Sequence, residues 1–181
     1  MSLPACGSLP QVAADYRVNA YFCNPDGPYV NLYIPSTLRW TQDGTQVSLT
    51  QRSRYPFDGV VKFDITVSKP TEFAIHLWIP AWAEGASIFV NGKPLPASEV
   101  PGKFVTIRGS WKKGDRIEMD LRMRLRLEAI DAQHPQTVAL LCGPQVLFAI
   151  TDAPPVVTAR QLLAAKKKLG SSHGKLRLPV G

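Results

Sequence analysis

The sequence predicts an all-β protein, an antiparallel β-sandwich with a jelly-roll-like strand order. Three observations predict it. Apolar residues recur with a period of two, turn dipeptides separate these alternating runs, and 16 prolines and 13 glycines among 181 residues disfavour long helices. A strand with one apolar face must bury that face against a second sheet or close into a barrel. With 45% hydrophobic residues, the chain can supply such a core.

The clearest alternation is RIEMDLRMRLRL at 116–127, where every odd position is apolar and every even position is charged. Because this run is longer than a usual strand, we expect a bend and one or two strands within 115–129. The strand at 60–67 should point Val61, Phe63, Ile65 and Val67 inward. The strand at 72–79 should point Phe73, Ile75, Leu77 and Ile79 inward and leave His76 and Trp78 on the opposite face.

Turn signals place the remaining elements. Asn91-Gly92 accepts the positive φ angles of a tight hairpin turn. The other expected strands lie near 18–23, 29–34, 37–41, 45–51, 87–91 and 103–108, with two more pieces within 137–150. A short helix is expected over Thr158–Leu169, because Thr158 can cap it and three leucines form a thin apolar stripe. Residues 175–178 resemble the start of a further strand.

The charge distribution argues against nucleic-acid binding. The formal net charge is +7, but a tail that begins at Arg160 holds six of the 21 basic residues and no acidic one. The rest of the chain is therefore nearly neutral and offers no broad basic surface for phosphates. The longest uncharged apolar runs are about ten residues, half of what a membrane-spanning helix needs. We expect neither a nucleic-acid nor a membrane partner.

The side-chain inventory contains no complete catalytic group. The three histidines and the aspartates near turns form no nucleophile–base pair, and nothing selects two of the carboxylates for glycoside hydrolysis. Cys142 lies in an apolar run, where a small buried side chain is expected. Four tryptophans are present, and Trp78 and Trp82 are candidates for stacking on a sugar. Tryptophans in a domain of this size also serve as core packing, so both alternatives remain open.

Five ordered phrases carry a resemblance to a known family. They are GPYVNLYIPS at 27–36, YPFDG at 55–59, IPAWAEGASIFVNGK at 79–93, GSWKKGD at 109–115 and VALLCGP at 138–144. Their succession resembles the C-terminal part of glycoside hydrolase family 127, the β-L-arabinofuranosidase family, over about residues 5–165. A single VNGK hairpin occurs in many carbohydrate-active sandwiches, so the specificity lies in the order of the five phrases.

The resemblance implies that this chain lacks the reactive part of its parent protein. Members of the family are similar in having an (α/α)6 catalytic barrel followed by β-sandwich domains, one of which can mediate dimerisation. Their zinc ion is held by a glutamate and cysteines, one of which is the proposed nucleophile. At most one of these cysteines, Cys6, is present here. One thiol cannot build a tetrahedral zinc site, so we expect no catalytic residue, metal or cofactor in this chain, although zinc is possible in the full-length parent.

The expected organisation has three parts. Residues 1–26 would be a remnant of the barrel edge and a linker, 27–155 the β-sandwich, and 156–181 the basic tail with a short helix and a truncated strand. The expected function is a non-catalytic accessory domain that braces the upstream barrel and contributes to a homodimer. The alternative is a carbohydrate-binding module that presents Trp78 or Trp82 to arabinose-containing plant glycans.

Overall fold

The computed structural model describes residues 18–96, 101–148 and 160–162. The chain divides into two units, Met1–Arg122 and Met123–Gly181. The described strands of the first unit are β1 (Tyr21–Asn24), β2 (Gly27–Val30), β3 (Ser36–Gln42), β4 (Thr45–Ser53), β5 (Val60–Val67), β6 (Thr71–Ile79), β7 (Ser87–Val90), β8 (Lys93–Pro94), β9 (Lys103–Trp111) and β10 (Arg116–Asp120). Those of the second unit are β11 (Leu125–Ala129), β12 (Val138–Cys142) and β13 (Gln145–Leu147). The all-β prediction is confirmed.

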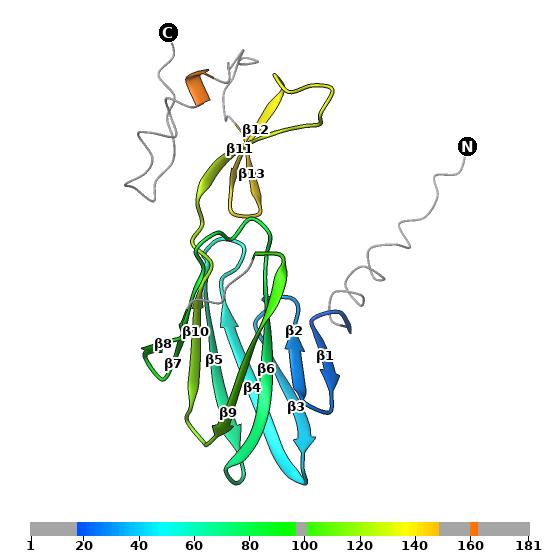
Figure 1. The fold of residues 1–181 in the computed structure, drawn as a ribbon, viewed down its shortest axis with the longest axis vertical. Coiled ribbons are helices and arrows are strands. Elements are labelled where there is room, and N and C mark those ends of the chain that lie inside the picture. The colour runs from blue at the N-terminus through cyan, green and yellow to red at the C-terminus, as the bar shows by residue number, and fades with distance from the viewer. Residues whose placement is uncertain (1–17, 97–100, 149–159, 163–181) are drawn as a thin grey trace, which may run out of the picture. The chain divides into compact units, whose positions relative to one another are not determined.

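Two sheets enclose the core of the first unit. One has four strands in the order β1-β2-β6-β9, and the other has six in the order β3-β4-β5-β10-β7-β8. Figure 1 shows β6 and β9 in front of β4 and β5. Buried side chains from both sheets form one cluster, and the partly buried Trp40 ring of β3 packs against it, meeting the Phe73 ring of β6 edge-on at 5.4 Å. Close packing of two inner faces is the sandwich arrangement that the period-two pattern predicts.

The predicted inward positions are confirmed on both sheets. The four inward residues of β5 and the four of β6 are all at most 4% exposed. Ile117, Met119 and Leu121, the first odd positions of the long alternating run, are completely buried. The polar side chain of Gln51 is also buried, and its Nε2 donates hydrogen bonds to the carbonyls of Leu32 and Ile34.

Two features differ from the predicted strands. The expected strand at 29–34 ends at Val30, because the carbonyls of Leu32 and Ile34 bond to the Gln51 side chain rather than to a neighbouring strand. In addition, β2 pairs with β6 in parallel, so the four-stranded sheet is mixed rather than antiparallel throughout. Gly27 permits this pairing: a Cβ there would lie 1.9 Å from the carbonyl oxygen of Ala74.

The predicted hairpin turn is present. Asn91 and Gly92 both have positive φ angles, 51° and 78°, and so do Asp43 and Gly44 between β3 and β4. Such angles match the twist of the flanking strands. The side chain of Asn91 also fixes the turn, because its Oδ1 accepts a hydrogen bond from the amide of Arg116 at 2.9 Å.

The long alternating run forms two strands, as expected. β10 ends at Asp120 and β11 begins at Leu125, and Arg122 between them has a φ of 44°, which interrupts the extended backbone. β11, β12 and β13 form an antiparallel three-stranded sheet within the second unit. Residues 160–162 are helical, inside the predicted helix, and the rest of that helix and the segment 175–178 lie outside the described residues. The domain boundaries at 27 and 155 stay a prediction. In the described part of the chain, no helix has the length and hydropathy needed to cross a membrane.

Candidate functional site

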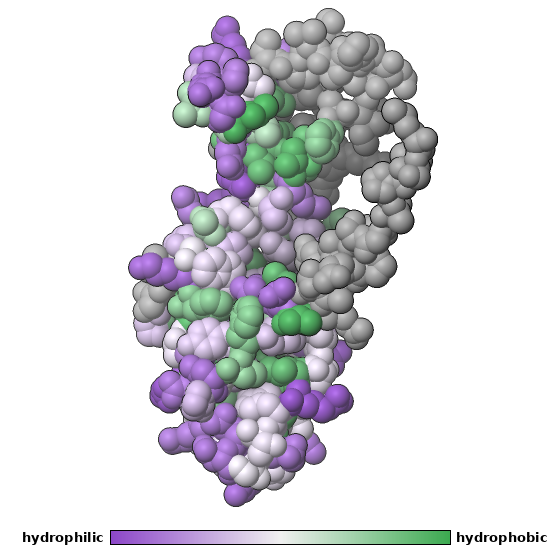
Figure 2. All heavy atoms as spheres, turned by 90° about the vertical axis from the view of Figure 1, so that its right-hand side faces the viewer, coloured by the Kyte–Doolittle hydropathy of each residue, from purple (hydrophilic) through white to green (hydrophobic). Residues whose placement is uncertain are grey.

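The outer face of the four-stranded sheet is aromatic. Strand pairing aligns Phe22 of β1 with Tyr29 of β2, Tyr29 with His76 of β6, and His76 with Thr106 of β9. One step along the same face, Trp78 of β6 pairs with Phe104 of β9. We call these rings, those of Phe22, Tyr29, His76, Trp78 and Phe104, the aromatic face. Figure 2, which views the molecule from the side of β1, shows hydrophobic residues gathered among hydrophilic ones.

Four of the five rings of the aromatic face, those other than Phe22, contact one another closely. The phenol of Tyr29 stacks on the imidazole of His76, with centroids 3.8 Å apart and planes within 9°. Phe104 meets Tyr29 edge-on at 5.1 Å and Trp78 at 5.0 Å. Such stacked and edge-to-face pairs each contribute about 1 kcal/mol beyond the area they bury. The face is therefore an ordered surface rather than a set of separate rings.

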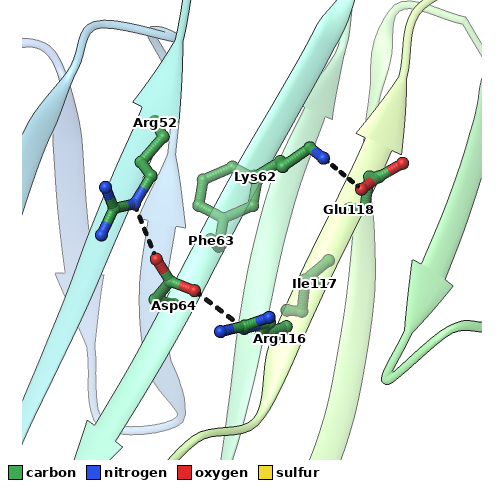
Figure 3. Close-up of a pocket in the computed structure, with 7 residues that line it drawn as sticks. All are labelled: Arg52, Lys62, Phe63, Asp64, Arg116, Ile117 and Glu118. Carbon is green, nitrogen blue, oxygen red and sulfur yellow. Dashed lines mark hydrogen bonds and ion pairs between the residues drawn. The ribbon is translucent and has the colours of Figure 1, made fainter.

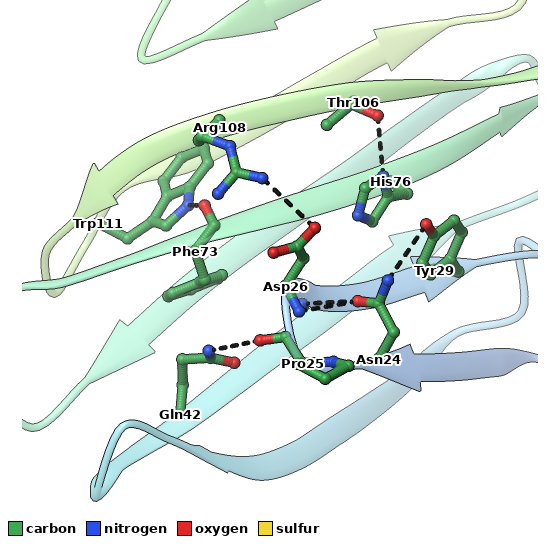
Figure 4. Close-up of polar contacts among 11 residues, drawn as sticks. Asn24, Pro25, Asp26, Tyr29, Gln42, Phe73, His76, Thr106, Arg108 and Trp111 are labelled. Carbon is green, nitrogen blue, oxygen red and sulfur yellow. Dashed lines mark hydrogen bonds and ion pairs between the residues drawn. The ribbon is translucent and has the colours of Figure 1, made fainter.

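Polar groups border the rings (Figure 4). The Nδ1 atom of His76 lies 2.9 Å from the hydroxyl of Thr106, and Asn24 Nδ2 donates a hydrogen bond to the Tyr29 hydroxyl at 3.4 Å. Asp26 and Arg108 form an exposed ion pair at 3.5 Å. Exposed pairs of this kind contribute less than about 1 kcal/mol.

His76 is the unusual polar residue of this face. Its side chain is only 5% exposed, and its Nε2 atom is buried without a hydrogen-bond partner among the described residues. Burial lowers the pKa of the imidazole, the nearby Asp26 carboxylate raises it, and Arg108 lowers it further. A buried nitrogen without a partner costs about 1–3 kcal/mol, so the isolated face is incomplete in hydrogen bonding.

The outer face of the six-stranded sheet has the opposite character. Asp64 of β5 accepts from the Nε atoms of Arg52 on β4 at 2.8 Å and Arg116 on β10 at 3.2 Å. Lys62 pairs with Glu118 at 3.1 Å, and these charged side chains line a shallow hollow of about 300 Å³ (Figure 3). Of the two outer faces, one therefore carries charged pairs and the other carries a cluster of rings.

The two predicted sugar-stacking tryptophans lie in different surroundings. Trp78 is half-buried on the aromatic face, with its indole against Phe104. Trp82, in the loop after β6, packs against the core with its indole nearly parallel to the Tyr55 ring at a centroid distance of 6.4 Å. No ring contact joins the two indoles, so the described geometry gives them no shared platform. Glycan binding at Trp78 or Trp82 stays a prediction.

The sequence prediction named Trp78 but missed the rings around it. Tyr29, His76 and Phe104 become neighbours only through the parallel pairing of β2 with β6 and the antiparallel pairing of β6 with β9. One signal was available in the sequence: Phe104, Thr106 and Arg108 occupy alternate positions of the expected strand, with the aliphatic Val105 and Ile107 between them. An aromatic residue at such an outward position indicates a covered face, although it does not identify the strands beside it.

Comparison with models of known protein families assigns most of the first unit to a family. The family model for the GH127 middle domain of β-L-arabinofuranosidases matches residues 27–123, more than half of the chain. The chain belongs to this family. The resemblance inferred from the five ordered phrases is thereby confirmed, and the matched part of the GH127 chain ends within one residue of the end of the first unit. A separate search among curated proteins finds no match.

Solved structures agree with this assignment. The GH127 chain is 28% identical to a GH127 β-L-arabinofuranosidase from Geobacillus stearothermophilus T6, with a TM-score of 0.70 over 78% of this chain and 24% of that one. It is 26% identical to a glycoside hydrolase, with a TM-score of 0.70 over 78% and 25% of the two chains. A GH127 β-arabinofuranosidase is 27% identical, with a TM-score of 0.61 over 70% and 23%. The chain thus spans about a quarter of the length of these proteins.

The described cysteines of this GH127 chain do not fit the zinc site that the family implies. Cys6 lies outside the described residues, and Cys23 and Cys142 belong to different units. Burial raises the pKa of both described thiols, which opposes the thiolate form that binds metal. Cys142 is only partly buried, and its thiol lies 3.8 Å from the carbonyl oxygen of Met123. Among the described residues, no group of three or more His, Cys, Asp or Glu side chains could hold a metal ion.

Proposed function

We propose that this chain is a non-catalytic accessory region of a glycoside hydrolase, and that its aromatic face packs against the catalytic domain and braces it. The observation that carries the proposal is the contrast between the two outer faces of the sandwich. Charged pairs cover the outer face of the six-stranded sheet, whereas five rings gather on the outer face of the other sheet. A sheet face that meets only water has no need of such rings.

Packing energetics support this assignment. Phe22 is 48% exposed and Tyr29, Trp78 and Phe104 are half-buried, so a partner would remove further apolar area from water. Complete burial of one exposed aromatic side chain contributes about 2 kcal/mol. Interfaces between domains of one chain typically bury about 600–1,500 Å², an area that several such rings and their polar border would supply. The matching structures are about four times longer than the region they share with this chain, and the catalytic domain is the partner we propose.

The test compares the same substitutions in two settings, the isolated chain and the parent protein that joins it to its catalytic domain. We expect Phe104→Ser and Tyr29→Ser to lower the unfolding temperature of the joined protein more than that of the isolated chain. Amide hydrogen exchange in β2, β6 and β9 should also be slower in the joined protein. Phe89→Ser on the opposite outer face is the matched control and should act equally in both settings. Equal effects of Phe104→Ser in the two settings would contradict the proposal.

Dimerisation through the same surface is the second candidate, because an uncovered aromatic face attracts a second copy as well as a partner domain. The two candidates differ in stoichiometry. If two copies of the joined protein dimerise through the aromatic face, the catalytic domain does not occupy that face. Proteolysis could then remove the catalytic domain without dissociating the dimer. Cleavage that releases monomers of this chain would exclude dimerisation at this face.

A further inference from the structure

We propose that the charged outer face of the six-stranded sheet binds a neutral oligosaccharide along β10. Two hollows lie on this face, one of about 300 Å³ between β4, β5 and β10 and one of about 370 Å³ between β10 and the β7–β8 turn. Arg116 and Glu118 line both hollows. We call the combined surface the β10 groove. It lies on the sheet face opposite the core, away from the aromatic face, so this inference is independent of the proposed docking.

The charges in the groove select the class of ligand. Its basic groups are Arg52, Lys62 and Arg116, and these alternate with the carboxylates of Asp64 and Glu118 (Figure 3). An anion that approaches the guanidinium groups is repelled by the neighbouring carboxylates. A cation that approaches the carboxylates is repelled by the neighbouring basic groups. A sugar hydroxyl carries no charge and both donates to a carboxylate and accepts from a guanidinium. A neutral polyhydroxyl chain therefore matches both kinds of group at once.

The hydrogen-bonding groups of the groove are only partly used. Within the described residues, Arg52 and Arg116 pair with Asp64 through their Nε atoms, and their side chains are 71% and 77% exposed. Their terminal N–H groups thus remain available for a ligand. Glu118 pairs with Lys62 through Oε2, which leaves its Oε1 as an acceptor. Asp64 bridges the two arginines, which places both guanidinium groups beside one carboxylate on this face.

Phe89 supplies the apolar part of the site. Its side chain is half-buried, lies directly across the strand pair from Glu118, and lines the second hollow with Asn91 and Gly92. Ligand sites commonly combine an apolar or aromatic wall with a few polar groups that fix orientation. The C–H face of a sugar ring can pack on Phe89 while its hydroxyls reach Arg116 and Glu118.

The experiment is an NMR titration of the purified chain with neutral arabinotetraose and, in parallel, with acidic trigalacturonate. We expect saturable shifts of backbone amides in β7 and β10 with arabinotetraose, with a Kd near the millimolar range, and weaker shifts with trigalacturonate. Arg116→Gln and Glu118→Gln, which change exposed or half-buried polar side chains, should weaken binding at least about tenfold. Phe89→Ala should do the same.

Arg39→Gln is the matched control, because Arg39 is exposed on β3 of the same sheet and lines neither hollow. It should bind like the unmodified chain. The proposal is overturned if no amide shifts up to about 10 mM sugar, or if Arg116→Gln binds as tightly as Arg39→Gln. It is also overturned if the shifts occur at the indole N–H groups of Trp78 and Trp82 instead, which would assign glycan binding to those tryptophans.

Discussion

The imidazole of His76 shows how the surroundings of one residue depend on the pairing of three strands. Tyr29 stacks on one side of its ring, Thr106 lies at Nδ1, and Nε2 has no partner among the described residues. A histidine chosen only for packing could be replaced by an apolar ring of the same shape. Because Nε2 is buried within the described residues, a partner docked on the aromatic face would not reach it, and the missing hydrogen bond is a cost that the fold itself carries.

The stability of the isolated chain should depend on pH through His76. Burial lowers the pKa of the folded imidazole, so below its unfolded value of 6.5 the unfolded chain binds more protons than the folded chain. The free energy of unfolding should therefore fall as pH drops below about 6.5, by at most about 1.4 kcal/mol per pH unit from this one group. Urea denaturation at pH 8, 6.5 and 5.5 measures the slope. His76→Phe keeps a ring beside Tyr29 and should reduce the slope of the unfolding free energy against pH. An unchanged slope would rule out His76 as the source of the pH dependence.

An added methyl group at Gly27 should strongly lower the free energy of unfolding. A Cβ would meet the Ala74 carbonyl oxygen at 1.9 Å, and the φ of 143° is unfavourable for other residues. We expect Gly27→Ala to lower the free energy of unfolding by at least about 3 kcal/mol. Gly44→Ala is the control, because Gly44 also has a positive φ but nothing within 4 Å, and should cost only about 1 kcal/mol. Chemical denaturation compares them, and similar losses would mean that β2 can move away from β6.

Among the elements, strands with a clean alternating pattern were the ones that the sequence predicted well. β5 and β6 fall within one residue of their predicted bounds, because one buried face imposes a strict period of two. The 29–34 segment was predicted less well, because its carbonyls are satisfied by Gln51, a residue that nothing local connects to it. The aromatic face was missed for the same reason. Its rings come from four strands, and no local pattern specifies which strands are neighbours.

The β7–β8 hairpin depends on one asparagine. Asn91 combines a φ of 51° with two hydrogen bonds, from the Arg116 amide to Oδ1 and from Nδ2 to Asp115. We expect Asn91→Ala to cost about 2–3 kcal/mol, because it loses both bonds and strains the turn. Asn91→Gly should cost about 1 kcal/mol less, because glycine accepts the left-handed angle. Thermal unfolding of the two variants separates the contributions; equal losses would show that the turn angle adds nothing.

At the scale of the whole molecule, the isolated chain should self-associate. Among the described residues, Phe22 is exposed and Tyr29, Trp78 and Phe104 are only half-buried, and apolar surface of this kind favours contact with a second copy. We expect a monomer at micromolar and a dimer at millimolar concentration by light scattering, with Tyr29→Ser shifting the equilibrium toward monomer. Phe89→Ser, on the charged side, should leave it unchanged. A monomer at millimolar concentration would contradict this expectation.

The isolated chain should also be inactive toward β-L-arabinofuranosides, with or without added zinc. The described residues hold no group that fits the metal, and Cys6 is one thiol where the family requires several ligands. Release of arabinose from a synthetic substrate measures the activity, and Cys6→Ser should leave the signal at background. Zinc-dependent turnover that Cys6→Ser abolishes would overturn the assignment of an accessory region.

The parallel pairing of β2 with β6 also bears on the order in which the protein folds. β3, β4 and β5 lie between these two strands in the sequence and pair with one another through local connections (Figure 1). Contacts between residues distant along the chain require costly loop closure, whereas such local pairs form early. On a ribosome, β2 could pair with β6 only after β6 has emerged, and the aromatic face, which also needs Phe104 of β9, would be completed later than the β3–β4–β5 part of the other sheet. The aromatic face of a nascent chain would thus stay incomplete until β9 has been synthesised, which limits premature contacts between copies.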